Sequence, residues 1–403
     1  MVTKGIYFIL AIGLFLLSGC AKKDKASADI TETYTIRKQV NIKKLKSKKL
    51  TESLAIEFLP VHYQNTTTHI KSIGELLNNQ FEEVVSIEKD IEIASKPGHF
   101  IGYKLEEYPD LRKTNWMVRL FLDNDIFSNT DYYYTNGFKI ELIVPGLNKS
   151  PINKIFPAFK NSDIEFCGFS ITQNIYTPTN PDTRVILLGD RPFAAFLTIG
   201  QFRETWHLPK AVYFKSELKL GVLGPSSLGQ QVQTSIHEIE PVGWQNQINN
   251  DIVIDYQILF KKGLYNSSLI DLNIIANGNI GTIFNKFGGG IDLRFGHFTP
   301  FYSGPLSFIE YVNPAGHLQY WIFFKAKGNL VAYDATMQGG IFNKENPYTL
   351  AANDLNRFVL DASIGIALYY NNIGIEYEHY YLSPEFKGAR HFGWGSIKAS
   401  LAF

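Results

Sequence analysis

The stretch that decides the fold is residues 364–381, which read IGIALYYNNIGIEYEHYY. Apolar side chains occupy every second position as far as Tyr370, and the pair Asn371-Asn372 then interrupts the run. From Ile373 the alternation resumes, now with glutamates on the opposite face. Two alternating runs joined by two turn-forming residues predict a β-hairpin with one apolar and one polar face.

The same period of two recurs from about Trp116 to the last residue, Phe403. The clearest further runs are residues 116–122, 138–144, 214–222 and 395–403. Strands of about ten residues with an apolar and a polar side are typical of transmembrane barrels. A terminal Phe that closes such a strand is similar to the signal of bacterial outer-membrane barrels. A soluble β-sandwich also has alternating strands and is the alternative. We therefore predict an all-β fold, an antiparallel transmembrane β-barrel over residues 111–403.

The composition narrows the class of protein further. The 403 residues include 39 Lys or Arg and 38 Asp or Glu, so the net charge of +1 gives no reason to expect a nucleic-acid partner. The 14% of aromatic residues and the 32 Gly favour β-structure. After the N-terminus no uncharged apolar run is long enough for a membrane-spanning helix, which excludes a polytopic helical membrane protein. The two cysteines exclude a disulfide scaffold, and we expect Cys167 to be a buried or wall-facing small residue.

The N-terminus carries the features of a secreted lipoprotein. Lys4 precedes an apolar run over residues 5–17, which is typical of a signal peptide. The sequence LSGC at residues 17–20 resembles a lipobox, and this implies cleavage before Cys20 and lipidation of its thiol. Residues 1–19 are therefore predicted to be a signal peptide.

The region between this leader and the barrel is strongly basic. Residues 21–50 hold ten Lys or Arg and only three acids. We interpret residues 20–110 as a lipidated basic tether that contains a possible helix. A clamp on anionic lipid head groups is the alternative role for the basic residues.

Polar residues gather where the first two predicted strands meet. Asn124 and Asp125 follow the run 116–122, and Thr135 precedes the run 138–144. Counting along these runs puts Asp125 and Thr135 in the odd, polar register that we expect to face the barrel interior. Carboxylate and hydroxyl oxygens at one rim suit Ca²⁺. An ordinary Asn/Asp-rich hairpin loop is the alternative.

A short helix is predicted between two later strands. Ser226 or Ser227 can cap it after Pro225. An apolar stripe of Leu228, Val232, Ile236 and Ile239 then lies opposite Gln230, Gln233 and His237. A titratable imidazole on a polar face can act as a general base, and a solvent-exposed loop histidine is the alternative. The chain contains no GxSxG, HExxH, P-loop or dinucleotide fingerprint.

Two further polar segments are noted between strands. We interpret Asp190-Arg191-Pro192 as a structural turn. Residues 243–247 form a polar loop with one anchoring tryptophan, Trp244.

Taken together, these clusters resemble the lipid A 3′-O-deacylase family of outer-membrane barrels. The resemblance covers about Trp116 to Phe403, and the matching stretches stand in the family's order. They are residues 124–125, 131, 134–137, 173–178, 190–194, 221–225, 233–237, 243–247 and 383–388. The resemblance implies a barrel of about twelve strands with an extracellular site near a helix formed by a loop. The family barrel needs no lipid anchor, so the N-terminal extension departs from the pattern.

The same resemblance implies Ca²⁺-dependent hydrolysis of the 3′-linked acyloxyacyl ester of lipid A. It implies that His237 is the general base and that Asn124 and Thr135 belong to the catalytic site. Asp125 and Thr135 are then expected to bind the Ca²⁺, which polarises the carbonyl and stabilises the oxyanion.

A glutamate shortly after the histidine also belongs to the family's site. Glu240 is the nearest match here, and Glu238 is the alternative. We expect lipid A or lipopolysaccharide as the substrate, the outer membrane as the location, and a monomer. A catalytically silent barrel with a structural or binding role and an outer-membrane phospholipase are the alternative functions.

Overall fold

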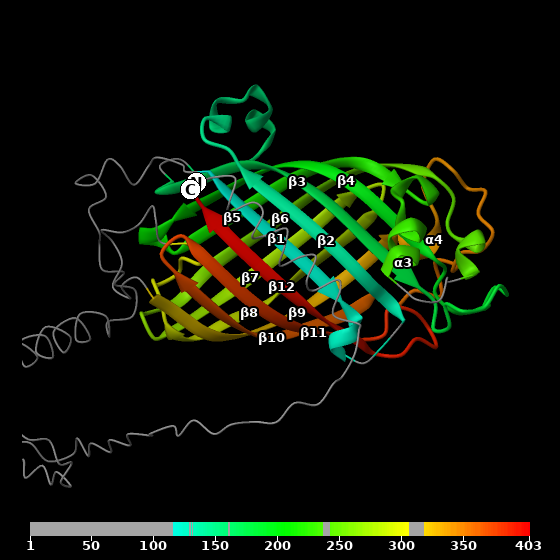
Figure 1. The fold of residues 1–403 in the computed structure, drawn as a ribbon. Coiled ribbons are helices and arrows are strands. Elements are labelled where there is room, and N and C mark those ends of the chain that lie inside the picture. The colour runs from blue at the N-terminus through cyan, green and yellow to red at the C-terminus, as the bar shows by residue number, and fades with distance from the viewer. Residues whose placement is uncertain (1–115, 129, 131, 160–161, 237–241, 306–317) are drawn as a thin grey trace, which may run out of the picture. The chain divides into compact units, whose positions relative to one another are not determined.

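The computed structural model describes residues 116–403, with gaps at 129, 131, 160–161, 237–241 and 306–317. Within the described part, twelve antiparallel strands form one closed barrel (Figure 1). The strands are β1 Met117–Asn124, β2 Tyr133–Ile143, β3 Ile164–Thr177, β4 Ala194–His207, β5 Val212–Leu223, β6 Asp251–Asn266, β7 Ile270–Gly281, β8 Phe284–His297, β9 Leu318–Asp334, β10 Phe358–Tyr370, β11 Ile373–Leu382 and β12 Phe392–Ala402. The predicted antiparallel barrel is confirmed, and the sandwich alternative is wrong because the sheet closes on itself.

Two short α-helices, α3 Gly229–Ile236 and α4 Ala335–Gln338, lie between strands. Neither they nor any other helix of the described residues has the length and apolar character needed to cross a bilayer.

Every strand pairs with its neighbours in sequence, and β1 pairs with β12 to close the barrel. The first and last strands meet at one rim, where the Phe403 amide donates a hydrogen bond to the Trp116 carbonyl. Short connections join β4 to β5, β6 to β7 and β10 to β11 at this rim. Short turns are typical of the periplasmic side, so the opposite rim, with α3 and α4, is extracellular.

The hairpin of β10 and β11 shows why the alternating sequence forms this wall. Its two-residue turn places Asn371 in the left-handed region, at φ 49°. Ile364 and Ile366 are 60% and 59% exposed on the outer face. Glu378 lies on the other face and pairs with Lys325 at 2.9 Å. The predicted hairpin is confirmed, with its apolar side turned to the bilayer and its polar side turned to the lumen.

Ion pairs fill the middle of the lumen. The buried Glu141 carboxylate lies 2.7 Å from both the Lys139 and the Lys215 ammonium groups and 3.4 Å from the Arg119 guanidinium. Glu204 pairs in turn with Arg119 at 2.9 Å and with Lys215 at 2.7 Å. Buried charges are tolerated when they are paired in this way, and the network links β1, β2, β4 and β5 across the interior.

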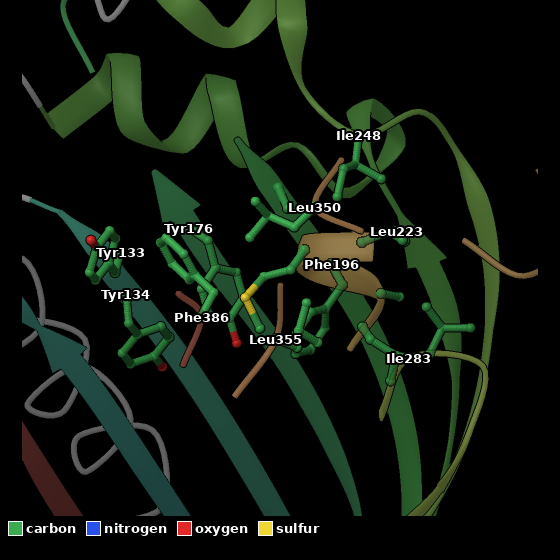
Figure 2. Close-up of a cluster of buried hydrophobic side chains, with 14 of the residues drawn as sticks. Tyr133, Tyr134, Tyr176, Phe196, Leu223, Ile248, Ile283, Leu350, Leu355 and Phe386 are labelled. Carbon is green, nitrogen blue, oxygen red and sulfur yellow. The ribbon is translucent and has the colours of Figure 1, made fainter. Parts of the chain in front are cut away.

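Hydrophobic clusters fill the lumen on either side of this network. The periplasmic cluster includes Phe166, Phe202, Trp206, Phe301 and Tyr302. The extracellular cluster, shown in Figure 2, includes Tyr133, Tyr134, Tyr176, Phe196, Leu223, Ile248, Ile283, Leu350, Leu355 and Phe386. Loop residues as well as strand residues contribute to it. The described side chains therefore occupy both ends of the barrel as well as its middle.

The apolar outer wall differs in height around the barrel. On β9 the outward side chains are exposed or half-buried all the way from Leu318 to Leu330. On β3 only Phe169 and Ile171 are exposed in the outward register. Towards the extracellular rim the wall is covered by α3. Towards the periplasmic rim it is covered by residues 144–159, which we call the β2–β3 cover.

Candidate functional site

The structure brings Asn124, Asp125 and Thr135 to adjoining strand ends at the extracellular rim. Asn124 ends β1 and lies opposite Asn136 of β2, the residue after Thr135. The Asn124 side-chain oxygen accepts a hydrogen bond from the Ile126 amide at 2.8 Å, which directs the chain into the 3-10 turn Asp125–Ser128. Asp125 is buried in that turn. Because Asp125 lies beyond the strand, strand counting does not determine where its carboxylate points.

A β-bulge decides the direction of Thr135. The pairing of β2 with β3 shifts register between Tyr134 and Asn136. The Tyr134 hydroxyl donates to Asp123 in the lumen, at 2.8 Å. The Thr135 hydroxyl instead lies 2.7 Å from the hydroxyl of Thr177, which is in the outward register of β3. The expectation that Thr135 faces the interior is therefore wrong, because the bulge adds one residue and shifts the alternation.

The outer wall is polar and buried at this point. Thr135 and Thr177 are 3% and 0% exposed, and Gln173 of the same outward register is 3% exposed. The Gln173 amide donates to the Ser227 carbonyl, just before α3. Gln173 and Thr177 are in the stretch 173–178 that resembles the family, but sequence reasoning did not place them beside Thr135. Both residues lie in the outward register of β3, in which Ile171, two residues before Gln173, faces the lipid. Polar residues in that register could have indicated a covered part of the wall.

Packing against the outer wall holds α3 beside this cluster. The buried Trp244 indole donates to the Gln233 side-chain oxygen at 2.7 Å, and its ring centroid lies 5.0 Å from that of Phe193. A Cβ atom added to Gly229 would lie 2.3 Å from the Cβ of Ala195 on β4. The helix therefore approaches the wall so closely that only glycine fits at its first position.

The predicted helix exists, but the prediction of its cap and of its faces is wrong. It begins at Gly229, and the Ser227 hydroxyl donates back to the Gly224 carbonyl at 2.6 Å rather than to the helix. Leu228 is half-exposed, whereas Gln233 is buried. The physical reason is that the helix rests on the outer wall, where the indole of Trp244 gives a buried glutamine its hydrogen-bond partner.

His237, Glu238 and Glu240 lie outside the described residues. The last described residue before them is Ile236, where α3 ends. Their assignment as general base and acidic partner stays a prediction.

The donor atoms near Asp125 are of the kind that binds a hard cation. The Asp125 carboxylate, the Thr135 hydroxyl and the side-chain oxygens of Asn124 and Asn136 come from adjoining strand ends. Ca²⁺ prefers such oxygen ligands. No group of three His, Cys, Asp or Glu side chains gathers anywhere in the described part of the chain. The donor types are ones that Ca²⁺ accepts, and Ca²⁺ dependence stays a prediction.

Arg191 has the structural role expected of its turn. It is 1% exposed and donates to Glu385 at 2.5 Å and to the Thr336 hydroxyl at 2.6 Å. Its guanidinium also lies 4.3 Å from the ring centroid of Tyr176. These contacts tie three extracellular loops to the cluster of Figure 2. Burial raises the pKa of the Glu385 carboxyl above its ordinary range, although Arg191 opposes the shift.

Cys167 is buried beneath the β2–β3 cover, as expected for a small wall residue. The Asn153 amide lies 3.4 Å from its sulfur.

Comparison with known proteins identifies the family of this chain. A family model described as outer membrane protein LpxR matches residues 93–403. Among solved structures, LpxR from Salmonella typhimurium is 18% identical, with a TM-score of 0.57 over 71% of this chain and 100% of that chain. The β domain of the Bordetella autotransporter BrkA is 10% identical, with a TM-score of 0.36 over 72% of this chain and 98% of that chain. No curated protein matches the sequence.

Proposed function

Because the chain belongs to the LpxR family of outer membrane proteins, we propose that it is a lipid A 3′-O-deacylase. The observation that carries the proposal is the position of the polar cluster. Thr135 and Thr177 lie on the outer face of the barrel at its extracellular end, while the lumen is filled by side chains. A site in this position serves a substrate that resides in the outer leaflet.

The wall beside the cluster suits such a substrate. Ile171 and Ile199 are exposed on the outer faces of β3 and β4, on the periplasmic side of the cluster. Acyl chains that lie against these isoleucines bring the ester linkages of a lipid to the level of Thr135. The lipid then reaches the site from the bilayer without entering the barrel.

The proposed reaction is the hydrolysis of the 3′-linked acyloxyacyl ester. His237 takes a proton from a water molecule as the water oxygen bonds to the acyl carbon. The bond between that carbon and the sugar oxygen then breaks, and His237 returns the proton to the leaving oxygen. Asn124 and Thr135 orient the ester, and Glu240 or Glu238 orients the imidazole. Ca²⁺ held by Asp125 and Thr135 supplies polarisation of the carbonyl and stabilisation of the oxyanion when bound.

The test is mass spectrometry of lipid A after incubation with the purified full chain in micelles. The wild type is compared with His237→Ala and with His391→Ala, which removes another extracellular histidine. Each is assayed after chelation and after return of Ca²⁺ or Mg²⁺. We expect loss of one acyloxyacyl unit with the wild type and His391→Ala when Ca²⁺ is present, and no loss with His237→Ala.

Each other result has a definite meaning. Deacylation by His237→Ala would contradict the assignment of the base. Deacylation after chelation would contradict the requirement for Ca²⁺. Unchanged lipid A together with lysophospholipid release would point to a phospholipase. Unchanged lipid A and phospholipid with a folded barrel would leave a silent barrel with a binding role.

A further inference from the structure

Polar side chains on the outer wall hold the β2–β3 cover against the barrel. Gln201 and Arg203 of β4 share the outward register of Ile199, which is exposed. The Gln201 amide donates to the buried Asn153 side chain at 3.1 Å. The Arg203 guanidinium donates to the carbonyls of Asn153 and Phe156, at 3.5 and 3.4 Å. The cover therefore folds back over the outer face and shields an arginine that lipid would otherwise meet.

Aromatic contacts extend the cover across two more strands. Phe156 is buried, and its ring stacks on Tyr256 of β6 with 6.3 Å between centroids. The Tyr256 hydroxyl also donates to the Ile155 carbonyl at 3.3 Å. Phe159 meets Phe214 of β5 edge to face, with 6.2 Å between centroids. The cover thus packs on the outer wall through contacts with β3 to β6.

The height of the wall places the cover within the bilayer. Residues of a tilted strand advance roughly 2.5 Å each along the barrel axis, because the rise is about 3.3 Å and the tilt about 40°. On β3 the exposed apolar wall between the buried Cys167 and Gln173 then spans roughly 15 Å, against roughly 30 Å from Leu318 to Leu330 on β9. The apolar band of outer-membrane barrels is about 25 Å tall. The rest of the height of the apolar band on the β3 side is therefore supplied by the two elements that cover the wall, α3 and the β2–β3 cover.

The free face of the cover has the chemistry of a membrane interface. Ile152 and Ile155 are 48% and 52% exposed, and Lys149 and Lys154 are exposed beside them. The cover contains no acidic residue. It lies towards the periplasmic rim, where the leaflet consists of phospholipids. We propose that the β2–β3 cover is a phospholipid-binding surface of the inner leaflet. Ile152 and Ile155 enter its acyl region, and Lys149 and Lys154 bind the phosphates of anionic lipids.

The depth of the cover can be measured with a nitroxide label at Ile155→Cys. The full chain, with Cys20 and Cys167 replaced by serine, is refolded into vesicles of phosphatidylethanolamine and phosphatidylglycerol. Labels at Ile322→Cys on the lipid-facing wall and at Glu345→Cys on an extracellular loop give the two reference environments. A difference in migration between unheated and heated samples on a denaturing gel confirms that each variant is folded. Collisions with oxygen and with a water-soluble nickel chelate report the depth.

We expect the label at Ile155→Cys to collide with nickel severalfold less often than the label at Glu345→Cys, and with oxygen nearly as often as the label at Ile322→Cys. Nickel collisions equal to those at Glu345→Cys would overturn the proposal, because they would place the cover in water. This measurement requires no catalysis, so its outcome is independent of the outcome of the deacylase assay.

The role of the lysines is tested in the same labelled chain. Replacing phosphatidylglycerol by phosphatidylcholine is expected to increase the mobility of the label at Ile155→Cys. The double variant Lys149→Gln/Lys154→Gln should show that higher mobility in both lipid mixtures. Equal mobility of the wild-type cover in the two mixtures would overturn the binding of anionic head groups.

Discussion

The hydrogen bond between Trp244 and Gln233 is the contact that should decide whether α3 stays on the barrel wall. The Trp244→Phe substitution keeps an aromatic ring against Phe193 but removes the indole N–H. The Gln233 side-chain oxygen, 2.7 Å from that nitrogen, would then be buried without its donor. Leaving a buried acceptor without a partner costs about 1–3 kcal/mol. We therefore expect the docked state of α3 to lose about 1–3 kcal/mol relative to the undocked state.

Amide hydrogen exchange measures this loss directly. A change of about 1–3 kcal/mol corresponds to about a fivefold to 150-fold faster exchange for amides that open with the helix. The most direct reporter is the Val232 amide, which donates to the Leu228 carbonyl at 3.1 Å. Amides of β9 and β10 should be unaffected, because α3 packs on β3 and β4. Lipid A deacylation is expected to fall in parallel, since the residue after α3 is the proposed base.

A second substitution separates the hydrogen bond from general loss of packing. Gln233→Leu removes the acceptor, so the double variant Trp244→Phe/Gln233→Leu leaves no buried polar atom of this pair without its partner. We expect the double variant to exchange more slowly than Trp244→Phe alone, with a coupling of about 0.5–3 kcal/mol. The reasoning would be refuted if Trp244→Phe left amide exchange in α3 unchanged. It would also be refuted if the effects of the two substitutions on the free energy of opening were additive.

Three further substitutions test the lumen, the loops and the site. Glu141→Gln removes one carboxylate of the lumen network while Arg119 and Lys215 keep Glu204 and Lys139 keeps Glu217, so it should lower the free energy of unfolding in urea by about 1–3 kcal/mol, and an unchanged free energy would contradict this. Because burial raises the pKa of Glu385, the stability that this carboxyl contributes is present below its ordinary pKa and is lost as the pH rises through the raised value. Glu385→Gln should remove that pH dependence. Identical plots of unfolding free energy against pH for the wild type and Glu385→Gln would argue against this role of the carboxyl. Thr135→Val should abolish deacylation and destabilise the barrel by about 1–3 kcal/mol, while Thr135→Ser retains both properties, and an active valine variant would exclude the hydroxyl from the reaction.

The strands could be predicted from the sequence because the bilayer imposes a simple rule on them. Outward positions such as Ile364 must be apolar and inward positions such as Glu378 can be charged, so the period of two is visible in each run. The closed sheet follows from the same rule, since an open edge is not tolerated in lipid. The number of strands came from the family resemblance, because each strand gives only a weak signal.

The details of the site could not be predicted because they break that rule. The bulge at Thr135 turns the threonine outward without any unusual residue to announce it. The burial of Gln233 depends on Trp244, which reaches it only after the intervening loop has folded back. The β2–β3 cover was missed for a similar reason. Its signal lay on another strand, where the outward positions of Gln201 and Arg203 are too polar for lipid.

The filled lumen matters for the cell as well as for the barrel. Ion pairs such as Glu141–Lys215 occupy its middle, and aromatic clusters occupy its two ends. A porin of similar width adds a diffusion route for every copy inserted, and the permeability barrier against antibiotics and bile salts weakens accordingly. In this protein ion pairs and aromatic side chains occupy much of the space that such a route needs. A barrel that acts on surface lipids, as proposed for this one, can therefore be present in many copies with a smaller effect on this barrier than a porin has.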